Sequence, residues 1–335
     1  MAFALVAMSK YPDHQYQRAI NGLSAKGLWG LVSTAFRLLV VGLTYPAHRS
    51  VVAAIEQDST RRVIKIYPRI VYRYTQTYLA SNIKRVRRLE MFRGHYEFIN
   101  NRFDSFLFDQ LLDGALVLWS AKRDGHQVSV SLSGPCMRTL HREGDLTLKM
   151  HMDGMALYNL AFSIVPTASL ELDCLPAWLH TNHAIFVGLV QGVPRNFEAM
   201  RQCTKACDDI APPDILMTAL AGMASALDIG TIVGVDDITT ISRNSLVSSA
   251  ASFNYAVFWE RYGACISQQR HHVMLVPFPE KPIQQIQAKH RGRTLNKRAF
   301  KAAVFDSASS VMHYRIRRPE DVAQDMESDR LRQLA

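Results

Sequence analysis

Hydrophobic and polar residues alternate with a period of two through the middle of the chain, beginning near residue 115. Four segments alternate or run apolar over the length of a strand, namely ALVLWS, HQVSVSLSG, DLTLKMHM and ALYNLAFSIVP. Turn pairs separate these segments, for example Asp124-Gly125 and Asp153-Gly154. Such alternation between Gly and Asp turns predicts antiparallel strands. AIFVGLVQG, ending at Gly192, extends this run to four or five strands.

The period then changes to that of a helix. Phe197, Met200 and Cys203 share one stripe in residues 196–210, which predicts an amphipathic helix. Pro212-Pro213 ends it, and Asp214 is predicted to cap a second helix over 215–227. GTIVGVDD then predicts a short strand, NYAVFWERYG a helix and HHVMLVPFP a strand. The order of elements predicts an α+β fold with a mixed sheet flanked by helices.

Residues 1–60 are moderately apolar and are predicted to be helical, and residues 61–93 are predicted to form a basic helix whose tyrosines face the core. A helical N-terminal region therefore precedes the sheet. We place the boundaries at 1–110 for this region, 111–280 for the α+β domain and 281–335 for a basic C-terminal tail.

Basic residues gather in two blocks. Residues 61–93 and residues 281–318 each hold ten Lys or Arg against one acidic residue, a net charge of +9 in each block. The rest of the chain is acidic, although the whole carries +10. Two basic blocks on an acidic body suit a polyanionic partner such as nucleic acid, a phosphorylated cofactor or an anionic membrane. A solvated basic surface is the alternative.

The five cysteines follow no CxxC pattern, and we interpret them as buried, reduced thiols. The apolar segment at residues 28–43 contains Arg37 and is too short to span a bilayer, so it is predicted to be buried or interfacial. The first eight residues lack the cationic start of a signal peptide. We therefore expect a cytoplasmic protein.

Candidate chemistry lies where strands end. After Gly192 a helix is expected, so backbone N–H groups there could hold a phosphate or an oxyanion, although a simple turn explains the glycine as well. Asp236 follows a strand and could act as a general base or as a helix cap. Arg142 and Glu143 precede another strand as functional groups or as a local ion pair. No P-loop, Rossmann glycine motif, HExxH or GxSxG occurs in the sequence.

An ordered set of motifs resembles the VirK/YbjX family of bacterial proteins. The set covers about residues 25–305 and comprises GHYEFINNRF, REGDLTLKM, LYNLAFSIV, FVGLVQG, TKACDDIAPPDILMTALAGMASALDI, YAVFWERYGA and KHRGR. The biochemistry of this family is largely unassigned, and some members are associated with virulence and envelope stress. The resemblance thus implies a relationship more than an activity.

Residues 128–277 also resemble the plan of the GNAT acyltransferases, in which a strand, a helix and a second parallel strand enclose the donor. The usual Gln/Arg-x-x-Gly-x-Gly/Ala loop is replaced by Gln191-Gly192-Val193-Pro194. This resemblance implies transfer of an acyl or aminoacyl group from tRNA, acyl carrier protein or CoA to a small amine. We expect no metal and no tightly bound cofactor.

The resemblance also implies roles for individual residues. Asp236 or Glu143 would handle the proton of the acceptor. The donor would lie at Val190, Gln191, Gly192 and Lys205, and the acceptor against Arg142, Tyr255 and Trp259. The carrier would bind the basic residues Arg85, Arg87, Arg88, Lys289, His290, Arg291 and Arg293. The alternative is a non-enzymatic protein on the surface of an anionic membrane, held by residues 28–43 beside a basic segment.

Overall fold

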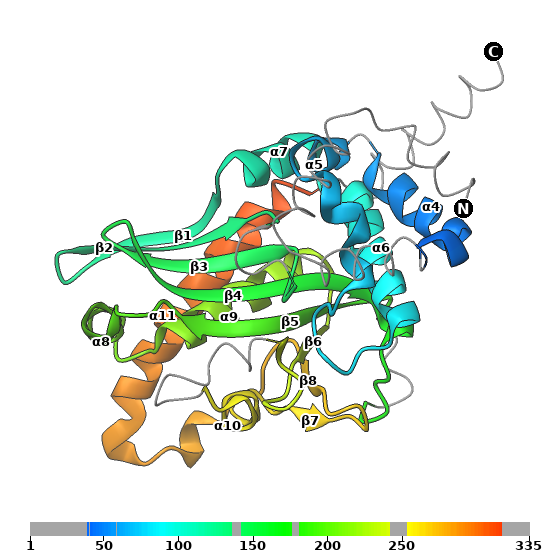
Figure 1. Cartoon of the computed structure of the whole chain (residues 1–335). Helices are drawn as coiled ribbons and strands as arrows, with labels where there is room; N and C mark the ends of the chain where they lie inside the picture. The colour runs from blue at the N-terminus through cyan, green and yellow to red at the C-terminus, as the bar shows by residue number, and fades with distance from the viewer. Residues whose placement is uncertain are drawn as a thin grey trace.

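The computed structural model describes residues 39, 41–57, 59–135, 142–175, 181–241 and 253–316. These residues build a single eight-stranded sheet with helices packed around it (Figure 1). The strands are β1 (Leu116–Arg123), β2 (His126–Ser133), β3 (Leu146–Met152), β4 (Met155–Pro166), β5 (His183–Gly192), β6 (Thr231–Gly234), β7 (Cys265–Ile266) and β8 (His272–Leu275). Their order across the sheet is β1-β2-β3-β4-β5-β6-β8-β7. The mixed sheet with its helices confirms the predicted α+β class.

The strands from β1 to β5 form an antiparallel run, as the alternating pattern predicts. Asp124 and Gly125 both adopt positive φ, 48° and 86°, in the turn between β1 and β2. Asp153 and Gly154 do the same between β3 and β4, at 51° and 79°. Tight hairpins favour Asp-Gly because both central residues need positive φ. The sequence therefore identifies these two turns correctly.

The pairing changes at β5. Among the described strands, β5 and β6 form the one parallel pair, with Ile185–Val187 opposite Ile232–Gly234. The connection between them contains α8 (Phe197–Ala206) and α9 (Pro212–Ala226). Parallel strands need such a long crossover because the chain must return to the end of the sheet where the first strand began. β8 then pairs antiparallel with β6, and β7 with β8.

Two groups of helices cover the sheet. α4 (Tyr45–Ile55), α5 (Arg61–Ile66), α6 (Arg85–Arg102) and α7 (Ser105–Asp113) gather at the right in Figure 1, where α6 packs on β4 and α4 on α6. α9 is buried on almost every side, between the sheet and α11 (Ala288–His313). A Cβ on Gly222 would lie 2.3 Å from the Phe305 carbonyl oxygen, so α9 needs glycine where α11 crosses it.

Several predictions of local structure need correction. Residues 61–93 do not form one helix, because Pro68 follows the end of α5 and begins the 3-10 helix Pro68–Thr75, and α6 begins only at Arg85. Tyr74 and Tyr78 in this segment are nevertheless buried, as predicted.

Asp214 does not cap α9, because the helix already begins at Pro212, which suits the first turn without an N–H to satisfy. The segment predicted as a tail contains α11, and the N-terminal helices share one hydrophobic core with the sheet. The three domain boundaries stay predictions.

Candidate functional site

The gap between β5 and β6 is closed by one short helix. Val235 donates to the Val187 carbonyl at 3.1 Å, and beyond that point the two strands share no further pairing. α10 (Tyr255–Glu260) lies across the opening. The Tyr255 hydroxyl accepts the Val190 N–H at 3.0 Å, and the Trp259 indole N–H donates to the Val235 carbonyl at 2.8 Å. The backbone groups that the strands leave unpaired are therefore satisfied by aromatic side chains.

The loop after β6 holds α10 in this position. The Asp237 carboxylate accepts the backbone N–H groups of Tyr255 at 3.0 Å and Ala256 at 3.4 Å, and the Asn254 side chain accepts that of Val257. The helix-capping role that the sequence suggested for Asp236 is thus taken by its neighbour Asp237. Burial raises the pKa of Tyr255 well above its ordinary value, so the phenol keeps its proton at neutral pH.

Asp236 is buried at the same edge of the sheet, with 5% of its surface exposed. One carboxylate oxygen accepts the Ile238 N–H at 2.9 Å, and the Arg270 guanidinium lies 3.3 Å from the other. His272 approaches that oxygen with its Nε2 at 3.4 Å. Burial acts to raise the pKa of Asp236, but the Ile238 N–H and Arg270 outweigh it and leave the pKa below its ordinary value. Asp236 is therefore an ionised carboxylate at neutral pH.

Two adjacent buried histidines enter the site on β8 and the turn before it. Burial lowers the pKa of His272, against the opposing effect of Asp236, so the imidazole is neutral at pH 7. Burial and the neighbouring His272 lower the pKa of His271 to about 4. The His271 ring packs edge-on against Phe186, and neither of its ring nitrogens has a hydrogen-bond partner within the described part of the chain.

Residues 79–82, from the N-terminal region, form hydrogen bonds with three loops of the site. Leu79 donates its N–H to the Arg142 carbonyl at 2.7 Å, and Ser81 donates to the Thr239 carbonyl at 2.8 Å. The Asn82 amide reaches the Gln269 carbonyl at 2.7 Å. Residues 79–82, which we name the bridging loop, therefore contact three loops that are far apart in sequence. Leu79 is held at a φ of 61°, a conformation that a leucine rarely adopts.

Glu143 crosses β5 beside this loop. A Cβ on Gly188 would lie 2.1 Å from the Glu143 carbonyl oxygen, so only glycine admits this crossing. The side chain of Glu143 is buried. Arg142, predicted to contact the acceptor, is half-buried and contributes its carbonyl to the bridging loop. Glu143 thus lies near the end of the β5–β6 pair, and Arg142 is next to it in the chain.

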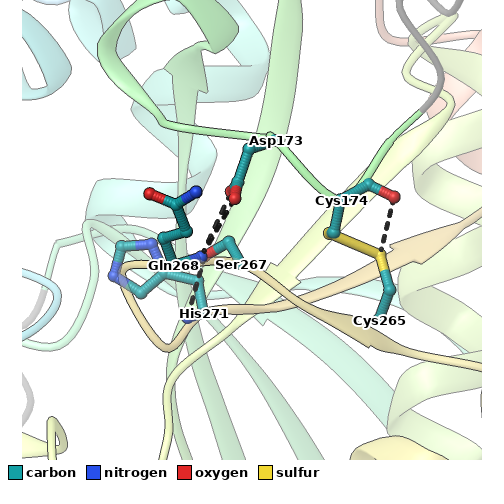
Figure 2. The surroundings of a disulfide bond; sticks show 6 residues. All are labelled: Asp173, Cys174, Cys265, Ser267, Gln268 and His271. Carbon is teal, nitrogen blue, oxygen red and sulfur yellow. Dashed lines mark hydrogen bonds between the residues drawn. A yellow bond between two sulfur atoms is a disulfide. The ribbon is translucent and has the colours of Figure 1, made fainter.

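A disulfide fixes the turn that carries Arg270. Figure 2 shows Cys174 bonded to Cys265, next to Asp173, whose carboxylate accepts the Gln268 N–H at 3.2 Å. This pairing corrects the prediction that the cysteines are reduced, because 91 residues separate the two and their proximity arises only in the fold. Cys203 and Cys207 are buried free thiols as predicted, and Cys136 lies outside the described residues.

A second buried carboxylate, Asp145, lies beneath the N-terminal helices. It forms an ion pair with Arg73 and accepts hydrogen bonds from the hydroxyls of Tyr78, Tyr96 and Ser163. Burial acts to raise its pKa, and Arg73 lowers it below the ordinary value. All of these side chains are enclosed by the core, so the cluster joins the helices to the sheet without reaching solvent.

The structure does not bring all the predicted donor and carrier residues to the gap. Lys205 is exposed in the last turn of α8, a helix length away from β5. Gln191 pairs with Asn159 of β4, and Gly192 packs near Tyr158.

Several of the predicted carrier residues hold the fold instead. Arg88 donates to the Ile83 and Gln76 carbonyls, Arg291 to those of Ile286 and Gln284, and Arg293 pairs with Asp209. Arg87 forms a surface pair with Glu90. Arg85, Lys289 and His290 are exposed.

Arg270 and His272 were missed because they face Asp236 only through the β6–β8 pairing, which the local pattern does not specify. The described residues contain no group of three or more ligands suited to a metal ion. None of the helices in the described ranges is long and apolar enough to cross a membrane.

Comparison with known proteins identifies relatives of unassigned function. The sequence matches the family described as "Protein of unknown function (DUF535)" over residues 29–300. It is 25% identical over 232 residues to "Uncharacterized protein YbjX" of Escherichia coli strain K12, which covers 67% of this chain and 66% of that protein, slightly less than two thirds of its length. No solved structure matches. The chain is a member of the DUF535 family, to which the family resemblance seen in its sequence also points.

Proposed function

We propose that the protein is a GNAT-like transferase that moves an acyl or aminoacyl group from a carrier to a small amine. The observation that carries the proposal is the end of the β5–β6 pair, where the Val190 N–H meets the Tyr255 hydroxyl in an opening between parallel strands. The order of elements supports the proposal. An antiparallel run, a helical connection between the parallel strands β5 and β6, and a later helix and strand also occur in the GNAT plan that the sequence resembles.

The residues of the gap suit each step of acyl transfer. A donor carbonyl that replaces the Tyr255 hydroxyl on Val190 N–H would have its developing oxyanion stabilised by that N–H. The amine nitrogen attacks the carbonyl carbon, and neutral His272 accepts the proton that the amine loses. Asp236 then stabilises the imidazolium. The low pKa of Asp236 makes it a weak base, which favours this supporting role.

The bond to the carrier then breaks, and Tyr255 donates its proton to the leaving group. Because burial raises the pKa of Tyr255, the phenol is protonated at neutral pH and has a proton to donate. Transfer of the proton from His272 back to Tyr255 restores both groups. The amine and the acyl carrier become an amide and the free carrier, with no other reactant consumed.

The test is a donor screen on the full-length protein. Acetyl-CoA, acyl carrier protein loaded with a fatty acyl group, and aminoacyl-tRNA are each incubated with a mixture of polyamines and amino sugars. Amide products are identified by mass spectrometry. We expect product with one donor, and a loss of about 100-fold or more in kcat for Tyr255→Phe and His272→Gln.

The matched control is Tyr314→Phe, which removes the same hydroxyl from a side chain that is 86% exposed. It should retain full activity. Absence of product with all three donors, or full activity in both gap variants, would overturn the proposal.

A second candidate function is attachment to an anionic membrane, favoured by one exposed surface. Leu43 and Val86 are 77% and 70% exposed, and the exposed cations Lys84 and Arg85 adjoin Val86. Burial raises the pKa of Tyr74, and Arg85 lies close enough to oppose this shift. The Tyr74 hydroxyl contacts His48 of α4, so these elements are neighbours. Apolar side chains among cations bind anionic interfaces. Sedimentation with phosphatidylserine vesicles, lost for Val86→Ser and retained for Val257→Ser, would support this function.

A further inference from the structure

A basic pocket lies between the amino-terminal half of α11 and the segment that joins α8 to α9. It encloses about 270 Å³ and is lined by Asp209, Ile210, Asp214, Glu280, Lys281, Thr294, Lys297, Arg298 and Lys301. The four residues from α11 recur at intervals of three and four, so they form one stripe facing the pocket. Lys297, Arg298 and Lys301 are half-buried.

Each carboxylate of the pocket has an arginine partner. Asp209 pairs with Arg293 at 2.7 Å, Asp214 with Arg261 at 3.0 Å and Glu280 with Arg298 at 2.8 Å. These pairs compensate the negative charge of the lining, so the positive charge of the lysines stays uncompensated.

Three lysines of the pocket have no acidic partner among the described residues. Lys281, Lys297 and Lys301 form no ion pair with any described carboxylate, and Lys297 donates only to the Asp209 carbonyl, at 2.8 Å. Three ammonium groups around a half-open pocket attract a ligand with two or more negative charges. The lining contains no aromatic ring on which a nucleobase could stack, so the pocket suits a phosphate group more than a base.

Asp214 connects the lining of the pocket to the residues that follow α10. Asp214 accepts a hydrogen bond from the hydroxyl of Tyr262 and pairs with Arg261, and both residues directly follow α10. The same stretch of chain carries Tyr255, which caps Val190. A ligand in the pocket would therefore lie at the carboxyl end of the helix that closes the gap.

We propose that Lys281, Lys297 and Lys301 bind the diphosphate of a pantetheine-type acyl carrier whose arm extends along α10 to Val190. This inference rests on the proposed transferase function and names the class of its donor. It also accounts for the absence of a glycine-rich phosphate loop after β5, where Glu198 in the first turn of α8 would repel a phosphate.

Calorimetric titration of the full-length protein with inorganic diphosphate and with CoA tests the pocket directly. We expect Lys297→Ala/Lys301→Ala to weaken both affinities about tenfold or more, because two charge-assisted contacts are lost. Raised salt should weaken wild-type binding as well. Lys122→Ala is the matched control, since it removes the same charge from an exposed position on β1, outside the pocket. Thermal unfolding of each variant reports whether the fold is retained, and Lys297→Gln/Lys301→Gln serves if the alanine variant unfolds.

Undiminished binding of diphosphate and CoA in both double variants would overturn the proposed pocket. An equal loss of affinity in Lys122→Ala would do the same. Tighter binding of a short single-stranded RNA that displaces diphosphate would overturn the pantetheine assignment. The two proposals can fail separately, because Tyr255→Phe and His272→Gln should leave diphosphate affinity unchanged while they abolish transfer. A pocket that binds diphosphate in a protein without transferase activity would retain the pocket and reject the function.

Discussion

Asp145 and Asp236 are both buried carboxylates paired with an arginine, yet their surroundings differ. Asp145 has Arg73 and three hydroxyls as partners, and all of them are enclosed by the core. Asp236 has Arg270, a side chain that is 57% exposed, and the neutral ring of His272. Both oxygens of Asp145 are bonded to buried side chains. Asp236, by contrast, is paired with an arginine whose side chain is exposed to solvent.

The difference separates a structural role from a chemical one. A buried ion pair whose carboxylate also accepts three hydrogen bonds is expensive to disturb, and a substrate cannot reach it. A carboxylate beside a neutral histidine at the rim of a gap can exchange partners when a ligand enters. The same residue type therefore fixes the N-terminal helices at one place and supports the candidate site at the other.

Substitution of the two carboxylates should give the largest contrast. Asp145→Asn leaves Arg73 charged and buried, so we expect the free energy of unfolding to fall by about 3–5 kcal/mol. Asp236→Asn should cost about 1 kcal/mol, because Arg270 can turn to solvent. Urea denaturation of both variants measures the two losses. Equal losses of unfolding free energy in the two variants would contradict the different roles assigned to Asp145 and Asp236.

Removal of the disulfide should act on one region alone. Cys174→Ser/Cys265→Ser should lower the free energy of unfolding by about 2–4 kcal/mol, since the unfolded chain is no longer constrained. Hydrogen exchange should rise in residues 265–275, which carry Arg270 and His272, and stay unchanged in residues 145–165. Cys203→Ser is the control for a cysteine without a bond. Detection of five thiols in the native protein purified without reductant would contradict the pairing.

Acid should weaken the fold through its buried histidines. His271 has a pKa of about 4 when folded against an ordinary 6.5, so unfolding takes up a proton between these values. Its contribution to the free energy of unfolding is present above about pH 6.5 and declines as the pH falls toward 4, by about 3 kcal/mol. Urea midpoints at a series of pH values measure the slope. His271→Phe should flatten it, and an unchanged slope would show that other groups, such as His95, dominate.

The smallest expected effect concerns the phenol in the gap. Tyr255→Phe removes the hydroxyl that accepts the Val190 N–H, and we expect a loss of about 1 kcal/mol in the free energy of unfolding. Faster exchange of the Val190 amide than of the Leu189 amide would localise the change. Equal protection of both amides in the variant would mean that another group covers Val190.

The sequence predicts the antiparallel run and its Asp-Gly turns because alternation and positive φ are local properties. It also predicts the strand that ends at Gly192 and the helix at Tyr255, since periodicity specifies both. The prediction of one helix over residues 61–93 is wrong, because this segment is divided into α5, a 3-10 helix and the start of α6. There the bridging loop is stabilised by the carbonyls of Arg142, Thr239 and Gln269, which no local pattern reveals.

Half of the candidate site could be anticipated in the same way. Asp236, Glu143 and Tyr255 follow recognisable ends of strands or begin a helix. The partners of Asp236 come from β8 and from the turn before it, and β8 lies between β6 and β7 in the sheet. The pairing of Cys174 with Cys265 depends on the same arrangement. The phosphate pocket was hidden for another reason. Net charge along the chain does not show which cations already hold a carboxylate.

The disulfide has a consequence for how the chain can be cut. Cys174 and Cys265 close a covalent ring of the backbone that contains β5, α8, α9, β6 and α10. The backbone groups of Val190, Val235 and Tyr255 therefore belong to one ring, whereas the bridging loop and α11 lie on the chain outside it. A protease that cleaves once inside the ring would leave a single species on a non-reducing gel and two fragments after reduction. The nicked molecule would still carry both walls of the gap.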